Sequence, residues 1–313
     1  MSDMDIKDIT LASQGRDKIN WVTSYMPVLS GIRDEFEASR PFRGMRVAMS
    51  IHLEAKTAYL AETLRAGGAE VHVTGCNPLS TQDDVAAALA AAGFEVNARH
   101  GVSEAEYTAH LMATLACRPH LIIDDGGDLI SLLHGGCREY GKNLIGGCEE
   151  TTTGIRRLRE RERAGQLDYT MININDAECK HLFDNRYGTG QSTIDAIMNT
   201  TNLIVAAKTV VVAGYGWCGK GFALRARGLG ANVIVTEINP VRALEAMRME
   251  RSQRRELQGK AKLQMDDVNR SGKLVFETEG LGLDFGDRTL FQGLDLQVLR
   301  GDKIALVGPN GCG

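Results

Sequence analysis

The chain has 313 residues, of which 43% are hydrophobic and 24% are charged, as expected for a globular protein of two domains and part of a third. Its formal net charge of -4 leaves no excess of basic residues to neutralise phosphates, which argues against general nucleic-acid binding. No apolar run approaches the ~20 residues that span a bilayer, and the acidic N-terminus lacks the apolar core of a signal peptide. We therefore expect a cytoplasmic protein with no membrane partner.

The cysteines are scattered along the chain, without a CxxC pair or a Cys/His spacing typical of zinc ligands. Their odd number and the expected reducing compartment favour free thiols over a disulfide framework, and no metal site is predicted. They are Cys76, Cys117, Cys137, Cys148, Cys179, Cys218 and Cys312.

Between residues 45 and 125, short apolar runs alternate with helical patterns. The pattern predicts strands at 45–52, 69–75, 94–99 and 120–125, and helices at 54–68 and 81–93. Ser103 and Glu106 have the spacing of a capping box that opens a further helix, and Ser80 or Thr81 is the expected N-cap of the helix at 81–93. This alternation predicts the α/β class, with a doubly wound parallel sheet whose ligands bind beyond the C-terminal ends of the strands.

A second α/β unit begins near Gln191, where a helix leads into the apolar strand TVVVA. Gly214, Gly216 and Gly219 then form G-x-G-x-x-G, and Glu237 ends the next strand. In a dinucleotide-binding turn these glycines make the turn, admit the pyrophosphate and let the helix pack closely. A carboxylate at the end of the next strand binds ribose hydroxyls and repels a 2′-phosphate, so NAD is favoured over NADP. The alternative is a glycine turn without a ligand.

Beyond Ala246 the pattern changes. Residues 247–272 are highly charged and predict a solvated helix followed by a linker, whereas residues 273–313 predict antiparallel strands that end in the glycine-rich loop Gly308–Gly313. The predicted domains are a substrate-binding domain at 1–190, a partial Rossmann NAD-binding domain at 191–246, the charged helix and linker at 247–272, and a short β-rich segment at 273–313.

Several segments together resemble the S-adenosylhomocysteine hydrolase (adenosylhomocysteinase) family. They are DITLASQGRDKINW, SIHLEAKTAYLAETLRAGGAEV, CNPLSTQDD, DDGGDL, CEETTTG, INDAECKHLFDNRYGTGQS and VVVAGYGWCGKG. They occur in the family's order between about Asp5 and Ala246, which makes the resemblance very specific.

The resemblance implies reversible hydrolysis of S-adenosylhomocysteine to adenosine and homocysteine, a step of the methyl cycle in one-carbon metabolism. In the implied reaction, NAD oxidises the ribose 3′-hydroxyl to a ketone, a base removes the C4′ hydrogen, and homocysteine leaves. Water then adds, and the ketone is reduced. Members of the family assemble as tetramers.

Four residues are implied to be catalytic. Lys180 matches the acid/base group at the 3′-hydroxyl, and Asp184 matches the residue that positions it. Asp125 matches the group near C4′ and C5′, and His52 an active-site histidine. Without the resemblance, Lys180 and Asp184 would be an ordinary i,i+4 surface salt bridge, and DDGGD a turn or capping cluster or a metal site.

The implied substrate contacts add two carboxylates to Asp125, Lys180 and Asp184. Glu150 matches the residue that grips the ribose hydroxyls. Glu54 stands where many members have a threonine that meets the substrate, and Thr189 replaces a cysteine found near the cofactor in the animal-type enzymes. These two departures suggest a different branch of the family.

The threonine run meets the nicotinamide riboside in the family, and the residue after the catalytic aspartate is a further cofactor contact. The residues implied to bind NAD are Thr151, Thr152, Thr153, Asn185, Gly214, Tyr215, Gly216, Trp217, Cys218, Gly219 and Glu237.

The tail from about residue 270 resembles the start of an ATP-binding cassette domain of the soluble, translation-associated kind. Phe285 would stack on adenine, and GPNGCG is a phosphate-loop start without the Lys and Ser/Thr that must follow. We expect a truncated fusion that lacks later βα units of the cofactor domain, with impaired tetramer assembly. The alternatives are a non-catalytic nucleotide-binding remnant and a fragment of a cassette ATPase acting on ribosomes.

Overall fold

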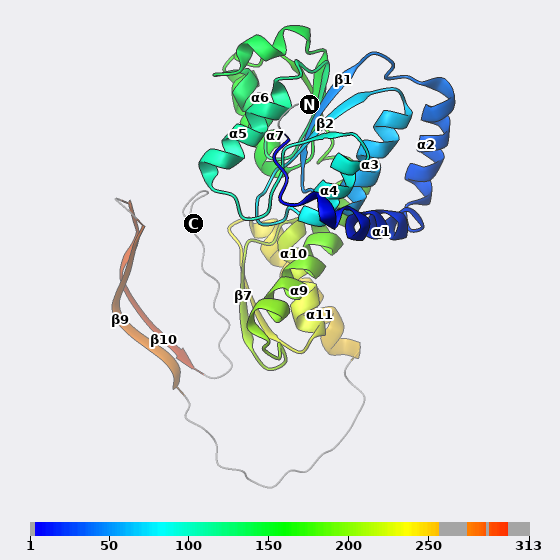
Figure 1. Ribbon diagram of the computed structural model, residues 1–313. Helices are drawn as coiled ribbons and strands as arrows, with labels where there is room; N and C mark the ends of the chain where they lie inside the picture. The colour runs from blue at the N-terminus through cyan, green and yellow to red at the C-terminus, as the bar shows by residue number, and fades with distance from the viewer. Residues whose placement is uncertain (1–3, 257–273, 286–287, 300–313) are drawn as a thin grey trace. The chain divides into compact units, whose positions relative to one another are not determined.

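The computed structural model describes residues 4–256, 274–285 and 288–299 (Figure 1). Its internal contacts divide the chain into two compact units between Ala177 and Glu178. In the part of the chain that is described, no helix is both long and apolar enough to cross a membrane. The functional domain assignment, with boundaries at 190, 246 and 272, stays a prediction.

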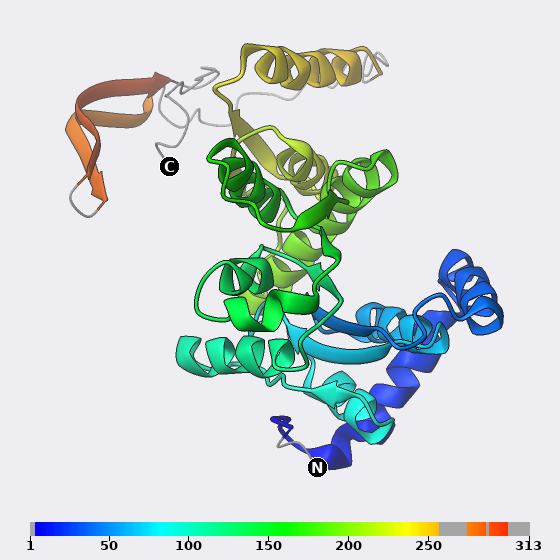
Figure 2. The same cartoon turned by 90° about the horizontal axis from the view of Figure 1, so that it is seen from above.

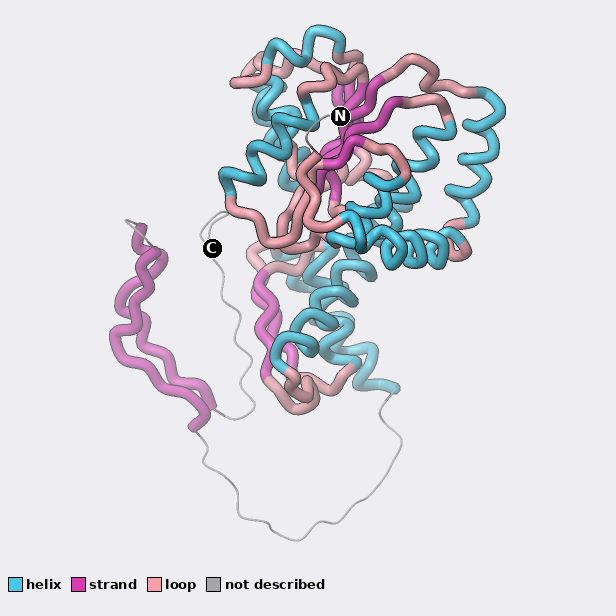
Figure 3. The backbone as a smooth tube through the Cα atoms, in the orientation of Figure 1, coloured by secondary structure: helices cyan, strands magenta, loops and turns pink. Residues whose placement is uncertain are grey.

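The first unit is built on a six-stranded sheet in which all neighbouring strands are parallel (Figure 3). The strands are β1 Arg46–Ile51, β2 Glu70–Gly75, β3 Glu95–Val96, β4 Leu121–Asp124, β5 Gly146–Glu149 and β6 Thr170–Asn173. Their order is β3-β2-β1-β4-β5-β6, and Val47 of β1 pairs with Val71 of β2 and Leu121 of β4. This order confirms the predicted doubly wound parallel sheet.

Helices cover both faces of this sheet. They are η1 Ile9–Leu11, α1 Ala12–Thr23, α2 Pro27–Ser39, α3 Ala55–Ala66, α4 Asp83–Ala91, α5 Glu104–Leu115, α6 Asp128–Leu133, η2 Arg138–Asn143 and α7 Thr152–Arg163. Successive strand residues enter opposite cores: Val47 and Met49 pack with α1, α3 and α4, whereas Ala48 and Ile122 pack with α5, α6 and α7. Figures 1 and 2 show the blue helices α1 and α2 beside α3, on one side of the sheet.

Helix starts follow the sequence signals in one case and not in another. The capping box of Ser103 and Glu106 opens α5 as predicted. Helix α4 begins later than predicted and has no side-chain cap, so the assignment of Ser80 or Thr81 as its N-cap is wrong. Both hydroxyls instead donate to the carbonyl oxygen of Asn77, each at 3.1 Å, because the turn before α4 satisfies them locally.

The second unit contains a strand–helix–strand arrangement. Its elements up to residue 256 are α8 Glu178–Lys180, the π-helix η3 His181–Gly188, α9 Thr189–Thr201, β7 Thr209–Ala213, α10 Trp217–Gly228, β8 Asn232–Thr236 and α11 Pro240–Glu256. Strands β7 and β8 are parallel, with Val211 opposite Ile234, and α10 connects them. This confirms the predicted partial Rossmann unit.

Gly190 of α9 and Gly221 of α10 let the helices of the second unit approach one another closely. A Cβ on Gly221 would overlap the carbonyl group of Arg186 in η3, and one on Gly190 would lie 2.6 Å from the backbone of Gly221. The backbone of η3, which carries Asp184 and Asn185, is therefore held directly against α10.

Strands β9 Leu274–Phe285 and β10 Arg288–Leu299 form an antiparallel pair, in which Phe285 lies opposite Arg288. This confirms the antiparallel strands predicted after residue 273. The helix predicted within 247–272 is the end of α11. The rest of that segment and the loop Gly308–Gly313 lie outside the described residues, so the cassette resemblance stays a prediction.

Candidate functional site

The strand order of the first unit reverses between β1 and β4, which are neighbours in the sheet. In open parallel sheets, ligands bind beyond the carboxyl ends of the strands at such a switch point. His52 comes directly after β1, and Asp125 directly after β4. The fold thus brings two predicted catalytic residues from distant parts of the sequence to the edge where a ligand is expected.

Asp125 is the centre of a small cluster of polar side chains. Its Oδ2 atom lies 3.6 Å from His52 Nε2 and accepts a hydrogen bond from the Cys76 thiol at 3.2 Å. The Asp125 side chain is 10% exposed and that of His52 51% exposed. Cys76 is not among the predicted site residues, although its position directly after β2 is a usable signal.

Ser80 fixes the orientation of the His52 ring. The Ser80 hydroxyl donates to the carbonyl oxygen of Asn77, and its oxygen lies 2.5 Å from His52 Nδ1. The tautomer of His52 decides which of the two atoms donates, and in either case the contact orients the ring. The Nε2 atom of the ring lies on the side of Asp125.

Burial, and after it the charge of Asp125, raises the pKa of the Cys76 thiol well above its usual range. The thiol therefore stays protonated and serves as a hydrogen-bond donor. The ligating atoms of His52, Cys76 and Asp125 lie within 4.8 Å of one another. A metal would have to displace the thiol proton that Asp125 accepts, and we assign no metal to this cluster.

Glu54, an implied substrate contact, is the residue before α3. Its side chain makes no capping bond, and its carboxylate lies 3.6 Å from the Lys56 ammonium. The side chain of Glu54 is 25% exposed and that of Lys56 62% exposed. The two residues therefore present an acceptor and a donor side by side, close in sequence to His52.

The loop after β5 carries Glu150 and the threonine run. The Glu150 amide donates to the carbonyl oxygen of the last residue of β4 at 3.1 Å, which ties this loop to the neighbouring strand. Thr151 precedes α7 without capping it, so the first amides of that helix are available to an anion or a carbonyl group. The Thr152 hydroxyl accepts from Asn175 at 3.2 Å, and Thr153 is exposed.

Lys180, Asp184 and Asn185 come together in the second unit. The Lys180 ammonium donates to Asn185 Oδ1 at 2.8 Å and lies 3.5 Å from Asp184 Oδ2. The side chain of Lys180 is only 15% exposed and Asn185 is buried, whereas Asp184 is 59% exposed. The lysine is thus more sheltered than in an ordinary surface salt bridge. Its partners lie on a π-helix, a feature frequent at functional sites.

The glycine turn after β7 has the geometry that a dinucleotide requires. Gly214 has a φ of 93°, and a Cβ on Gly219 would overlap the carbonyl oxygen of Gly214. The surface at Gly216 is open, since a Cβ there would meet only the Arg242 guanidinium at 3.8 Å. No side chain caps α10 at Gly216, so its first amides can receive phosphate oxygens.

Glu237 completes this turn from the end of β8. Its carboxylate accepts from the amides of Tyr215 at 2.6 Å and Asn239 at 2.8 Å. Burial opposes ionisation of Glu237, but these backbone hydrogen bonds outweigh it and its pKa is lowered. The carboxylate is therefore ionised at neutral pH and suited to accept from ribose hydroxyls. The turn and Glu237 together fit NAD.

Three further predicted cofactor residues lie beside the turn. Tyr215 is 3% exposed, whereas Cys218 is an exposed free thiol in the first turn of α10. The Trp217 ring lies 4.7 Å from the Lys220 ammonium. Lys220 is not among the predicted site residues; it is buried and pairs with Glu245 at 2.6 Å, and its position directly after the third glycine is the available signal.

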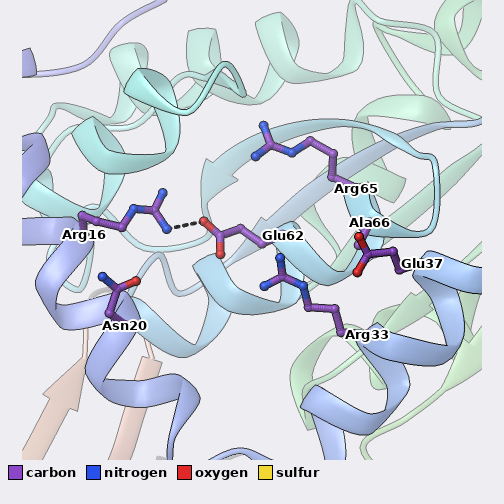
Figure 4. A pocket seen from close by; sticks show the side chains of 7 residues that line it. All are labelled: Arg16, Asn20, Arg33, Glu37, Glu62, Arg65 and Ala66. Atoms are coloured by element: carbon purple, nitrogen blue, oxygen red, sulfur yellow. Dashed lines mark hydrogen bonds and ion pairs between the residues drawn. The ribbon is translucent and has the colours of Figure 1, made fainter.

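A separate cleft of about 460 Å³ lies among the helices of the first unit (Figure 4). Its lining residues are Arg16 and Asn20 of α1, Arg33 and Glu37 of α2, and Glu62, Arg65 and Ala66 of α3. Arg16 and Glu62 form an ion pair of 2.5 Å within it. Because Glu62 lies late in α3, which starts at the carboxyl edge of the sheet, the cleft lies toward the other edge and is not part of the cluster around Asp125.

Polar residues gathered at the switch point of a doubly wound sheet, and a dinucleotide-binding turn, define a nucleotide-binding α/β protein. The sequence model of S-adenosyl-L-homocysteine hydrolase matches residues 3–145 and 138–213, and that of the family's NAD-binding domain matches residues 185–281. The chain belongs to the S-adenosyl-L-homocysteine hydrolase family, which confirms the resemblance found in the sequence. The second match supports NAD as the cofactor, and it extends past Ala246, where that resemblance ended.

Relatives with two different names are identical to this chain at more than half of the aligned positions. S-inosyl-L-homocysteine hydrolase of Methanocaldococcus jannaschii is 57% identical over 242 residues, which cover 77% of this chain and 58% of the relative. Adenosylhomocysteinase of Pyrococcus abyssi is 56% identical over 245 residues, which cover 78% of this chain and 58% of the relative. The adenosylhomocysteinase of Thermotoga maritima is 59% identical over 233 residues, which cover 74% of this chain and 58% of the relative. The chain thus spans less than two thirds of the length of these relatives.

Proposed function

We propose that this chain hydrolyses S-adenosyl-L-homocysteine to adenosine and homocysteine, with NAD as a recycled cofactor. Membership of the family and the fit of the glycine turn to NAD support this activity. The observation that carries the proposal is the convergence of His52 and Asp125 at the switch point of the sheet, because that is where this fold binds ligands.

The residues of the first unit would act on the ribose. Asp125 and His52 would together remove the C4′ hydrogen and later return it, because a carboxylate and an imidazole lie side by side there. Glu150 would accept hydrogen bonds from the ribose hydroxyls. The Cys76 thiol, as a donor to Asp125, would keep that carboxylate in one orientation.

The residues of the second unit would act on the 3′-oxygen and hold the cofactor. Lys180, positioned by Asp184 and Asn185, would exchange a proton with the 3′-hydroxyl. When bound, NAD would accept a hydride from the 3′ carbon and return it at the end of the cycle. The turn from Gly214 to Gly219 would hold its pyrophosphate.

A chromatographic assay for homocysteine, with the purified chain, NAD and S-adenosylhomocysteine, tests the activity. Lys180→Ala should abolish release, whereas Lys142→Ala, on the exposed surface of η2, should leave it unchanged. Equal release by the native chain and Lys180→Ala would refute the role of the lysine. No release by the folded native chain would refute the hydrolase proposal.

S-inosyl-L-homocysteine is a second candidate substrate, because the 57% identical methanogen relative bears that name. The same assay with both thioethers at equal concentration decides between them. The higher kcat/KM identifies the preferred purine, since specificity is the ratio of these values.

A further inference from the structure

Two carboxyl side chains, Asp124 and Glu149, lie completely buried directly behind the proposed site. They are the last residues of the neighbouring strands β4 and β5, where they are partners in register, and both are 0% exposed. Residues paired in this way direct their side chains to the same face of the sheet. Two acidic groups are therefore neighbours in a place where a charge is costly.

Each carboxyl group accepts hydrogen bonds from the loops that form the site. Asp124 Oδ2 accepts from the Ile130 amide at 3.0 Å, in the first turns of α6. Glu149 Oε1 accepts from the amides of Gly126 and Thr151, each at 2.9 Å. Among the described residues, no lysine, arginine or histidine forms an ion pair with either group.

One oxygen of each group is left without a partner. Asp124 Oδ1 and Glu149 Oε2 are buried and accept no hydrogen bond from the described protein atoms. Burial raises the pKa of Asp124 to about 8 and that of Glu149 to about 7. A proton held by the pair would remove the repulsion of two like charges in this buried place.

We propose that Asp124 and Glu149 share one proton near neutral pH and act as a positioning pair for Asp125 and Glu150. The inference rests on the proposed function, in which Asp125 and Glu150 contact the substrate. Each of these residues directly follows one member of the pair, so the pair holds the backbone from which both side chains project. The Glu150 amide also donates to the Asp124 carbonyl oxygen at 3.1 Å, which couples the two loops.

The loop after β4 depends on this support. Gly126 and Gly127 have φ values of 111° and 77°, a backbone that glycine adopts easily. Glu149 supplies a partner for the Gly126 amide. The Glu149 carboxyl group also packs directly against α7, because a Cβ on Gly154 of that helix would overlap it. Loss of Glu149 would therefore free the loop that carries Asp125.

Other titratable and charged groups surround the pair. Asp128 of α6 accepts from the Tyr107 hydroxyl at 2.9 Å and pairs with Arg157 of α7 at 3.0 Å. Asp125 contacts His52 and Cys76, and Glu150 follows Glu149. A pH dependence of the native chain alone would contain contributions from these groups, so it has to be compared with that of variants in which only the pair is changed.

Infrared spectroscopy of the full chain tests the shared proton. The native chain should show the carbonyl stretch of a protonated carboxyl group at about pH 7, which the isosteric double variant D124N/E149Q lacks. Asp84→Asn is the matched control, since Asp84 is buried but paired with Lys18 at 2.6 Å, and it should keep the band. Absence of the band from the native chain, or its persistence in the double variant, would overturn the shared proton.

Calorimetric titration with adenosine tests the positioning role. Glu149→Ala should weaken binding by roughly tenfold or more at about pH 6, because the loop amides lose the oxygen that accepts from them. Glu149→Gln keeps an acceptor oxygen, so its affinity should stay within roughly threefold of the native value at that pH. Between about pH 6 and 9 the native chain should lose more affinity than Glu149→Gln, because only the native pair gains a second buried charge.

The outcomes separate the inference from the proposed function. If the folded native chain binds no adenosine, the proposed function fails, while the infrared band still decides whether the proton is shared. If the native chain binds adenosine and Glu149→Ala binds it equally well, the positioning role is wrong although the function stands. If Glu149→Ala does not fold, the pH profiles of the native chain and Glu149→Gln decide the question, and identical profiles overturn the proposal.

Discussion

Gly219 of α10 is packed so closely against Gly214 that a Cβ on Gly219 would overlap the Gly214 carbonyl oxygen. Gly228, at the other end of the same helix, has no atom within 4 Å of such a Cβ. The two glycines therefore differ in what they contribute: the first sets the shape of the cofactor turn, and the second only continues the helix.

Gly219→Ala should abolish detectable NAD binding, because the added methyl group displaces the turn that receives the pyrophosphate. Gly228→Ala should leave the affinity unchanged within roughly twofold, since only helix propensity changes. Calorimetric titration of both variants with NAD measures this difference. Retention of NAD by Gly219→Ala would show that the turn is not the pyrophosphate site.

Gly15 of α1 has a similar role in the first unit. A Cβ on Gly15 would overlap the carbonyl oxygen of Asp84 in α4, whereas one on Gly31 of α2 meets nothing within 4 Å. Gly15→Ala should destabilise the unit by roughly 1–3 kcal/mol through overpacking. Gly31→Ala should stabilise it by about 0.5–1 kcal/mol through helix propensity. Urea unfolding in a Trp217→Phe background, followed by Trp21 fluorescence, measures both; equal effects would contradict the packing argument.

The sequence predicts the fold of both units well because each element has a strong local signal. The apolar runs before His52 and Asp125 are buried strands, and the G-x-G-x-x-G pattern lies in a strand–turn–helix as expected. The position of a residue directly after a strand was enough to place His52 and Asp125 at one edge of the sheet. That placement follows from parallel strands alone.

The sequence does not reveal contacts that depend on which loops meet in space. Ser80 has the spacing of an N-cap, yet its hydroxyl contacts His52, from the loop after another strand. Cys76 has no ligand-like spacing, yet it donates to Asp125. Asp124 and Glu149 sit in apolar or glycine-rich strands, where a single sequence gives no sign that two acids are register partners.

Lys56 beside Glu54 offers a test of purine preference. A 6-oxopurine presents an acceptor at O6 and a donor at N1, whereas adenine presents the reverse pair. If the Glu54–Lys56 pair meets the purine edge, Lys56 donates to O6 of an inosyl substrate, and Lys56→Met leaves that oxygen unpaired. Lys56→Met should then lower kcat/KM for S-inosylhomocysteine roughly tenfold more than for S-adenosylhomocysteine. Lys142→Met is the control, and an equal change for both substrates would place the pair away from the purine.

The raised pKa values of Asp124 and Glu149 also predict how stability depends on pH. Burial raises the pKa of Asp124 from 3.8 to about 8 and that of Glu149 from 4.5 to about 7. The folded state therefore binds protons that the unfolded state has lost, and this stabilisation is complete below about pH 4 and decreases as the pH rises through about 8.

Asp124→Asn should flatten this dependence by up to about 1.4 kcal/mol per pH unit, because one of the two raised groups is gone. Urea unfolding between about pH 5 and 8, again followed by Trp21 fluorescence in the Trp217→Phe background, measures the slope. Asp84→Asn should keep the native slope, since Asp84 is paired with Lys18. A native slope in Asp124→Asn would mean that Asp124 is ionised in the folded chain, and the two buried oxygens would then need a partner other than a proton.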